Sequence, residues 1–71
     1  MAESVYKVIT LVGTSTESWE KAASAAISLA SQSLRDLRVG KVVEQDIHIE
    51  AGQPFTYRIK LEVSFKYEGG A

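Results

Sequence analysis

The sequence of 71 residues contains no cysteine, one histidine and one proline. Without cysteine the chain forms neither disulfides nor thiolate metal sites, and a single histidine, His48, excludes a multi-histidine site within one subunit. A chain of this length buries only about 60% of the surface that its unfolded form exposes, so it needs disulfides, a metal or oligomerisation to be stable. Given this composition, we expect oligomerisation to supply the missing stability.

Signals for several binding and targeting functions are also missing. The formal net charge of −1 gives no reason to expect nucleic-acid binding, which calls for clustered lysine and arginine. The longest apolar runs, such as residues 8–12, are far shorter than the roughly 20 residues of a membrane span. The start Met-Ala-Glu-Ser is acidic and lacks the pattern of a secretory signal. We therefore expect a cytoplasmic protein that binds neither nucleic acid nor membranes.

The residues needed for catalysis are missing as well. The chain has no cysteine nucleophile, no Ser–His–Asp set whose members can be placed together, and no pair of carboxylates with visibly different environments. The sequence therefore predicts a protein that is not an enzyme.

The first half of the chain predicts a strand followed by a helix. Residues 5–12 are rich in β-branched and aromatic residues and end at Gly13, which is typical of a strand. From Trp19 to Leu37 apolar residues recur at steps of three and four, which predicts one amphipathic helix over about residues 16–37. Half of the apolar positions of this helix are alanine, so the helix can lie close against the element that covers it.

Both ends of the helix carry recognisable signals. Thr14 and Glu17 have the spacing of a capping box, although Ser15 or Thr16 could be the cap instead. Gly40 follows the helix and is expected to break it.

The second half of the chain predicts two strands joined by a turn. Residues 41–50 form one strand, residues 51–54 the turn, and residues 55–67 the other strand. In the last strand apolar and polar residues alternate without a slip, so the register is strongly determined. The apolar face comprises Phe55, Tyr57, Ile59, Leu61, Val63, Phe65 and Tyr67.

These elements predict an α+β fold with β-α-β-β order, formed by a single domain over residues 1–71 with flexible ends at about 1–4 and 68–71. Antiparallel pairing of the second and third strands follows from the short turn, and the helix is expected to cover the apolar face of the sheet. The last strand would be roughly 40 Å long, well above the usual strand length. Such long edges leave hydrogen-bonding groups and apolar surface uncovered, and we expect neighbouring subunits to cover them.

Four stretches of the sequence together resemble the dodecin family, and the resemblance spans nearly the whole chain. They are Tyr6-Lys7-Val8, Val12-Gly13-Thr14-Ser15 before an alanine-rich helix, Val42-Val43-Glu44-Gln45, and residues 56–65. The resemblance implies a curved antiparallel three-stranded sheet wrapped around the helix. It also implies that twelve copies form a hollow dodecamer, a closed symmetric oligomer that stores or quenches flavins such as FMN, riboflavin or lumichrome.

The resemblance places the flavin pocket at Val39, Glu44, Gln45 and Arg58, and two of these residues depart from the family pattern. Val39 stands where flavin-binding dodecins have a tryptophan that stacks on the flavin ring, and losing such a stack costs about 1–3 kcal/mol. Arg58 stands where they have a glutamine, and arginine can donate hydrogen bonds but not accept them. Trp19, on the helix, does not replace the missing tryptophan.

The same departures bring the chain close to a subgroup of dodecins that is described as binding calcium instead of flavin. The segments Thr14-Ser15-x-x-Ser18-Trp19-Glu20 and Glu44-Gln45-Asp46 are similar to that subgroup. Two functions therefore stay open: an altered flavin-type binder, or a calcium-binding or purely structural dodecamer that has lost flavin binding.

Carboxylates suggest where a cation could bind, with Asp36, Glu44 and Asp46 as the candidate ligands. Glu44, Asp46, His48 and Glu50 alternate along one strand and so share a face, and carboxylate oxygens suit Ca²⁺. The favoured alternative pairs these residues across the hairpin with Arg58, Lys60 and Lys66. Asp36 could hold a cation with the carbonyls at the helix end, or be solvated beside neighbouring arginines. For His48 a surface position is favoured over a role as general base.

Overall fold

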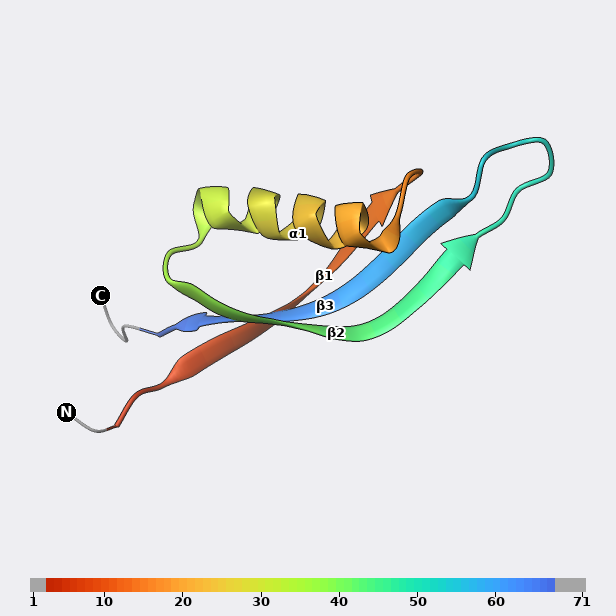
Figure 1. Ribbon diagram of the computed structural model, residues 1–71. Coiled ribbons are helices and arrows are strands. Elements are labelled where there is room, and N and C mark those ends of the chain that lie inside the picture. The colour runs from red at the N-terminus through yellow and green to blue at the C-terminus, as the bar shows by residue number, and fades with distance from the viewer. Residues whose placement is uncertain (1–2, 68–71) are drawn as a thin grey trace.

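The protein folds as a strand, a helix and two further strands, which confirms the predicted β-α-β-β order (Figure 1). The computed structural model describes residues 3–67. Its elements are β1 (Tyr6–Ser15), α1 (Trp19–Ser33), β2 (Leu37–His48) and β3 (Thr56–Lys66). Of the predicted flexible ends, residues 1–2 and 68–71 lie outside the described residues, while residues 3–4 precede β1.

The three strands form one antiparallel sheet in the order β1-β3-β2, so β3 is central. The pairing of β1 with β3 runs without a shift from Tyr6 opposite Lys66 to Ser15 opposite Tyr57. The pairing of β2 with β3 shifts twice, between Leu37 and Val39 and again between Val42 and Glu44. Such irregularities increase the local twist and bend of a strand, and Figure 1 shows β2 and β3 curving beneath α1.

The core lies between α1 and the central strand. Ile59, Leu61 and Val63 alternate along β3 and are only 1–2% exposed, which confirms the face predicted from the alternation. On the helix, Ala22 is completely buried against them. Small helix residues allow this close approach, as the sequence predicts.

Gly13 allows the closest contact between the helix and the sheet. It is a paired residue of β1, opposite Ile59, and does not end the strand as predicted. A Cβ atom at this position would lie 2.1 Å from the carbonyl oxygen of Ala22 and 3.0 Å from the Cβ of Ala26. The glycine is therefore required by packing against the backbone of α1.

The helix is shorter than the predicted residues 16–37. It begins after Ser18, whose hydroxyl accepts a hydrogen bond from the amide of Lys21 at 3.0 Å. The predicted caps are therefore wrong, and Ser15 accepts instead from the amide of Glu17 in the preceding turn. A short hydroxyl-rich segment offers several possible caps, and Ser18, immediately before the helix, is the residue that caps it.

The helix ends at Ser33 because the chain turns there into β2. Leu34 is already extended, and Asp36 has a left-handed φ of 56°, which redirects the chain. Leu37 then pairs with Phe65 as the first residue of β2, and Gly40 lies opposite Val63 within the strand and breaks no helix. β2 therefore begins four residues earlier than the predicted 41 and ends at His48.

A single subunit leaves much apolar surface exposed. Its accessible area is 5394 Å², whereas a compact protein of 7.8 kDa has about 4,400 Å². Among the described residues the large hydrophobic side chains that are at least 42% exposed are Val5, Tyr6, Val8, Val12, Leu29, Val39, Val42, Val43, Ile49, Phe55 and Tyr67. In the described part of the chain, no helix is long and apolar enough to span a membrane.

We predict that Gly13→Ala destabilises the fold strongly, while Gly40→Ala is tolerated. The first substitution places a methyl group against the backbone of α1, whereas the second meets only the flexible Cδ1 of Ile27 at 3.2 Å. Overpacking against a backbone costs about 3 kcal/mol, and we expect a loss below about 1 kcal/mol for Gly40→Ala. Urea unfolding at one fixed protein concentration measures both losses. Equal losses would contradict the proposed packing role.

Candidate functional site

The sheet has one face under the helix and one open face, and the predicted pocket residues are divided between them. Arg58 lies on the open face, because along β3 it alternates with residues that are buried under the helix. Val39 and Glu44 lie on the same open face, because their partners in β3 also alternate with those buried residues. Gln45 lies opposite buried Ile59 and shares a hollow with Trp19 on the helix side. A single subunit therefore does not bring these four residues together.

The open face carries a polar hollow of about 200 Å³, lined by Val12, Glu44, Asp46, Arg58 and Lys60. These residues form two adjacent rows across the sheet. Val12, Lys60 and Glu44 form one row, and Arg58 with Asp46 belongs to the next. The hollow thus contains two carboxylates and two cations, whose formal charges cancel.

Asp46 and Arg58 form the strongest polar contact in the hollow. The Nε and Nη2 atoms of Arg58 donate to Oδ1 and Oδ2 of Asp46 at 2.7 and 2.9 Å, in the bidentate geometry that guanidinium and carboxylate favour. This contact confirms the cross-strand charge pairing expected for Asp46. Lys66, another predicted partner, lies instead at the far end of β3, opposite Tyr6.

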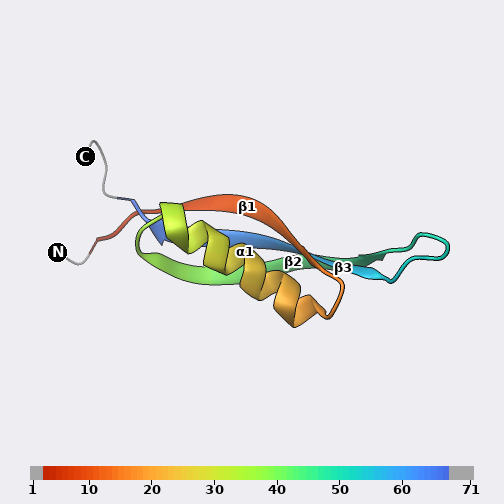
Figure 2. The same cartoon turned by 90° about the horizontal axis from the view of Figure 1, so that it is seen from above.

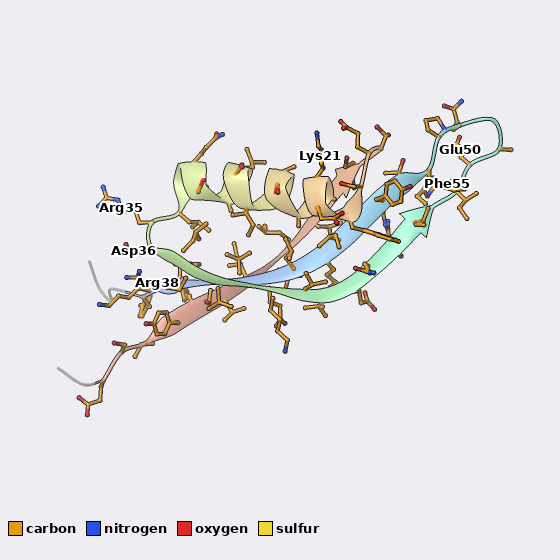
Figure 3. The ribbon with its side chains drawn as sticks, in the orientation of Figure 1. Lys21, Arg35, Asp36, Arg38, Glu50 and Phe55 are labelled. Carbon is orange, nitrogen blue, oxygen red and sulfur yellow. The ribbon has the colours of Figure 1, made fainter. Side chains whose placement is uncertain are left out.

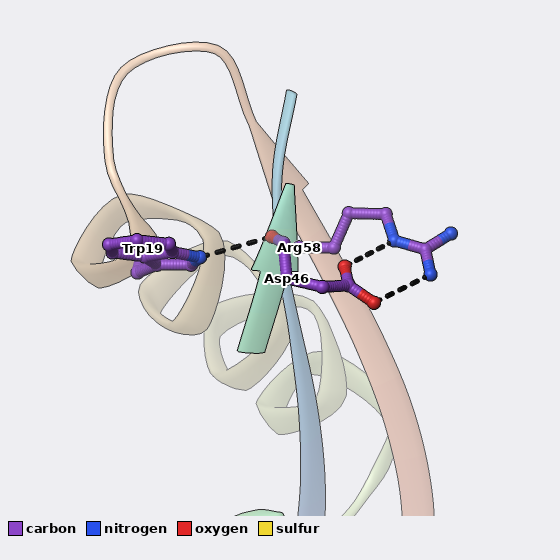
Figure 4. A network of polar contacts seen from close by, with 3 residues as sticks. All are labelled: Trp19, Asp46 and Arg58. Atoms are coloured by element: carbon purple, nitrogen blue, oxygen red, sulfur yellow. Dashed lines mark hydrogen bonds and ion pairs between the residues drawn. The ribbon is translucent and has the colours of Figure 1, made fainter. Parts of the chain in front are cut away.

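A tryptophan connects this ion pair to the helix, as Figure 4 shows. Nε1 of Trp19 donates to the backbone carbonyl of Asp46 at 3.1 Å. The ring of Trp19 also meets that of Tyr57 edge to face, with centroids 5.1 Å apart at 72°. Trp19 thus holds the end of β2 against the start of α1, which agrees with its expected packing role. The hydrogen bond to Asp46 could not be anticipated, because it joins residues far apart in the sequence.

The pKa of Asp46 is lowered by this arrangement. The hydrogen bonds from Arg58 are the largest cause, partial desolvation opposes them, and the charges of Arg58 and His48 lower the pKa further. The pKa of Arg58 is raised in turn, chiefly by its hydrogen bonds to Asp46. Arg58 therefore has a charged partner inside its own subunit.

Val39 is remote from this hollow. It is 60% exposed and lies opposite Ser64, six positions along β3 from Arg58. Six residues of extended strand span about 20 Å. A ligand that contacts both side chains must therefore be very long or bind between subunits.

The three candidate metal ligands do not form one site in a subunit. Asp36 lies at the turn between α1 and β2, where its carbonyl accepts a hydrogen bond from the amide of Lys66 at 3.3 Å. Ten residues of mostly extended chain separate Asp36 from Asp46, which spans roughly 30 Å. Across residues 3–67 no three Asp, Glu or His side chains are grouped closely enough to hold a metal ion. His48 is a surface residue of β2, with Nε2 3.6 Å from a carboxylate oxygen of Glu50.

Within the described residues, the carboxylates of one subunit therefore do not form a calcium site by themselves. Calcium takes about six to eight oxygen ligands, and both carboxylate oxygens of Asp46 already accept hydrogen bonds from Arg58. Glu44 is the other carboxylate in the hollow. Any calcium site that uses Glu44 needs further oxygens, which backbone carbonyls, water or a neighbouring subunit can supply.

We predict that Arg58→Met raises the pKa of Asp46 toward its ordinary value of 3.8. Because folding lowers this pKa, the ion pair adds stability above pH 3.8, and that contribution disappears as the pH falls through the lowered folded value. The stability difference between the wild type and the variant should therefore be present at pH 7 and vanish in acid. NMR titration of the Asp46 carboxyl carbon and urea unfolding at several pH values test this. Lys60→Met is the control, and an unchanged Asp46 pKa in Arg58→Met would refute the assignment.

Comparison with known proteins gives the family. The model of the dodecin family matches residues 5–68. Calcium dodecin of Mycobacterium tuberculosis is 56% identical over 63 residues, which cover 89% of each chain. Dodecin of Thermus thermophilus is 41% identical over 64 residues, which cover 90% of this chain and 93% of the other.

A solved structure shows the same fold. The crystal structure of the M. tuberculosis protein, described as a calcium-chelating antigen with a novel calcium-binding site, superimposes with a TM-score of 0.85 at 51% identity. The match covers 96% of this chain and 97% of that one. The chain described here therefore belongs to the dodecin family.

Proposed function

We propose that this protein is a homo-oligomeric calcium-binding dodecin that has lost the flavin site of its family. The observation that carries the proposal is the 56% identity with calcium dodecin over 89% of both chains. Dodecins are non-catalytic binding proteins, and flavins and calcium are the two ligands associated with the family and with this relative. The choice between the two ligands depends on the open face.

The residues on the open face favour calcium over flavin. Val39 provides no ring at the position assigned to flavin stacking, and Arg58 is held by both oxygens of Asp46. To donate to a flavin, Arg58 would have to give up a charged partner. Both differences weaken flavin binding, whereas neither removes the carboxylate of Glu44.

The dodecamer expected from the family supplies what one subunit lacks. Strands β1 and β2 are both edge strands, and the excess of about 1,000 Å² of accessible area is comparable with the roughly 800 Å² per partner in a standard interface. We infer that calcium is bound where copies meet, with Glu44 as one ligand and with oxygens from more than one subunit. Asp36, which lies at the turn between α1 and β2 and far from Glu44 of the same subunit, is a candidate ligand from a neighbouring copy.

We predict that calcium raises the melting temperature of the wild-type assembly, and that EDTA reverses the effect. Glu44→Gln should weaken calcium binding at least about tenfold, because loss of even an outer-shell partner typically has such an effect. Glu17→Gln is the control, because Glu17 pairs with exposed Lys21 beside the helix, away from the open face. Isothermal titration with CaCl₂ measures the affinities. No binding of calcium by the wild type would refute the proposal.

We also predict that flavin and lumichrome are not bound tightly by the wild type and that Val39→Trp restores binding. Restoring the ring supplies about 1–3 kcal/mol of stacking, which corresponds to roughly a 5- to 150-fold gain in affinity. Quenching of ligand fluorescence during titration measures both proteins, with Val39→Leu as the control for side-chain size. Tight quenching by the wild type would instead favour the flavin-type function.

A further inference from the structure

The helix and β1 enclose an apolar groove that the subunit does not fill. The groove has a volume of about 310 Å³ and is lined almost entirely by apolar side chains, including Ile9, Leu11, Ala26, Leu29, Ala30 and Leu34. Leu29 is 68% exposed. The groove therefore offers space for one or two apolar side chains.

The β2–β3 hairpin ends in an apolar tip that its own subunit does not cover. Ile49 and Phe55 flank the turn and are 71% and 50% exposed. The turn is compact, with the amide of Gln53 donating to the carbonyl of Glu50 at 3.0 Å and with Gly52 at a φ of 78°. Figures 1 and 2 show that the tip extends past the N-terminal end of α1.

The tip cannot reach the groove of its own subunit. Trp19, at the start of α1, already contacts Tyr57 near the base of the hairpin. Leu29 lies ten residues further along the helix, about 15 Å in the direction away from the tip. The two apolar surfaces are thus at different ends of a molecule that is 55 Å long, and only a second copy can bring them together.

Charge favours the same head-to-tail contact. Arg35 directly follows Leu34, which lines the groove, and the segment Arg35-Asp36-Leu37-Arg38 carries a formal charge of +1. Glu50 lies on the hairpin tip beside Phe55 (Figure 3). Figure 3 shows the two arginines and Glu50 at opposite ends of the subunit. Complementary charges at the rim guide the docking of an apolar contact.

We propose that the hairpin tip of one copy docks in the groove between α1 and β1 of a neighbouring copy. Ile49 and Phe55 would fill the groove, and Glu50 would lie near Arg35 of the neighbour. The contact joins two different surfaces and is therefore heterologous. Such a contact forms a closed assembly when the successive rotations from one copy to the next return to the first copy. The inference rests on the proposed homo-oligomer and identifies one contact that builds it.

Disulfide trapping tests the contact directly, because the natural chain has no cysteine. In the double variant Leu29→Cys with Phe55→Cys, mild oxidation should link chains into dimers and larger species on a non-reducing gel. A bond within one chain is excluded, because disulfides require Cα atoms within about 7 Å. Leu29→Cys with Val8→Cys is the matched control and should give no such series, because Val8 is on the open face. Each single variant is measured alongside.

The outcomes separate this contact from the proposed function. Cross-linking that requires both cysteines supports the inference. Cross-linking by Leu29→Cys alone would overturn it, since grooves would then face each other. An intact wild-type oligomer with no cross-link in the double variant would overturn this contact while leaving calcium binding and assembly in place. A monomer in light scattering would overturn both.

A charge exchange supplies a second test that does not depend on cysteine chemistry. Arg35→Glu and Glu50→Arg should each lower the fraction of assembled protein at low salt, and the double variant should restore it. Circular dichroism confirms that each variant keeps its fold. Failure of the double variant to recover assembly would overturn the proposed pairing of tip and groove.

Discussion

A mismatch in size between one short helix and one long sheet determines most features of this protein. The helix α1 has 15 residues, while β2 and β3 have 12 and 11. Because each strand residue spans about twice the length of a helix residue, both strands are longer than the helix and extend past it at the hairpin (Figure 1). The helix covers the middle of β3, where Ile59, Leu61 and Val63 are buried, and leaves grooves along its sides. Because hydrophobic burial is the main favourable contribution to folding, the uncovered apolar surface makes association with further copies the natural source of additional stability.

The polar residues of the open face follow from the same geometry. The sheet turns one face away from the helix, and Asp46 and Arg58 meet there across neighbouring strands. Trp19 holds the backbone of Asp46 from the opposite side of the sheet, so the ion pair is attached to the core through a residue that is not itself charged. An arginine already paired within its subunit is a poor donor for a flavin. In the proposed function Glu44, the other carboxylate of the hollow, contributes to a site shared between copies.

The sequence predicts the fold well where one periodicity dominates. The unbroken alternation of β3 identifies the buried face, because alternate side chains of a strand point to opposite sides. The end of the helix is wrongly predicted because Leu34 and Leu37 continue the helical spacing, although Leu34 caps the helix and Leu37 pairs with Phe65 in β2. The deciding feature is the left-handed backbone at Asp36, which no apolar pattern encodes.

The candidate site is less predictable, for a physical reason. Alternation correctly places Glu44 and Asp46 on one face, and charge pairing correctly predicts a partner for Asp46. By contrast, Val39 and Arg58 are aligned with one pocket by family resemblance but lie about 20 Å apart in a subunit. Their possible convergence depends on contacts between copies, and such contacts leave no local spacing in the sequence of one chain.

Native mass spectrometry of the purified protein, with and without calcium, shows whether the protein is a calcium-binding dodecamer, because it counts subunits and bound ions in the same particle. We expect one assembly of twelve chains of 7.8 kDa, about 94 kDa in total, which gains calcium in a fixed ratio to subunits and loses it on chelation. A single chain of 7.8 kDa, or a dodecamer that takes up flavin but no calcium, would contradict it.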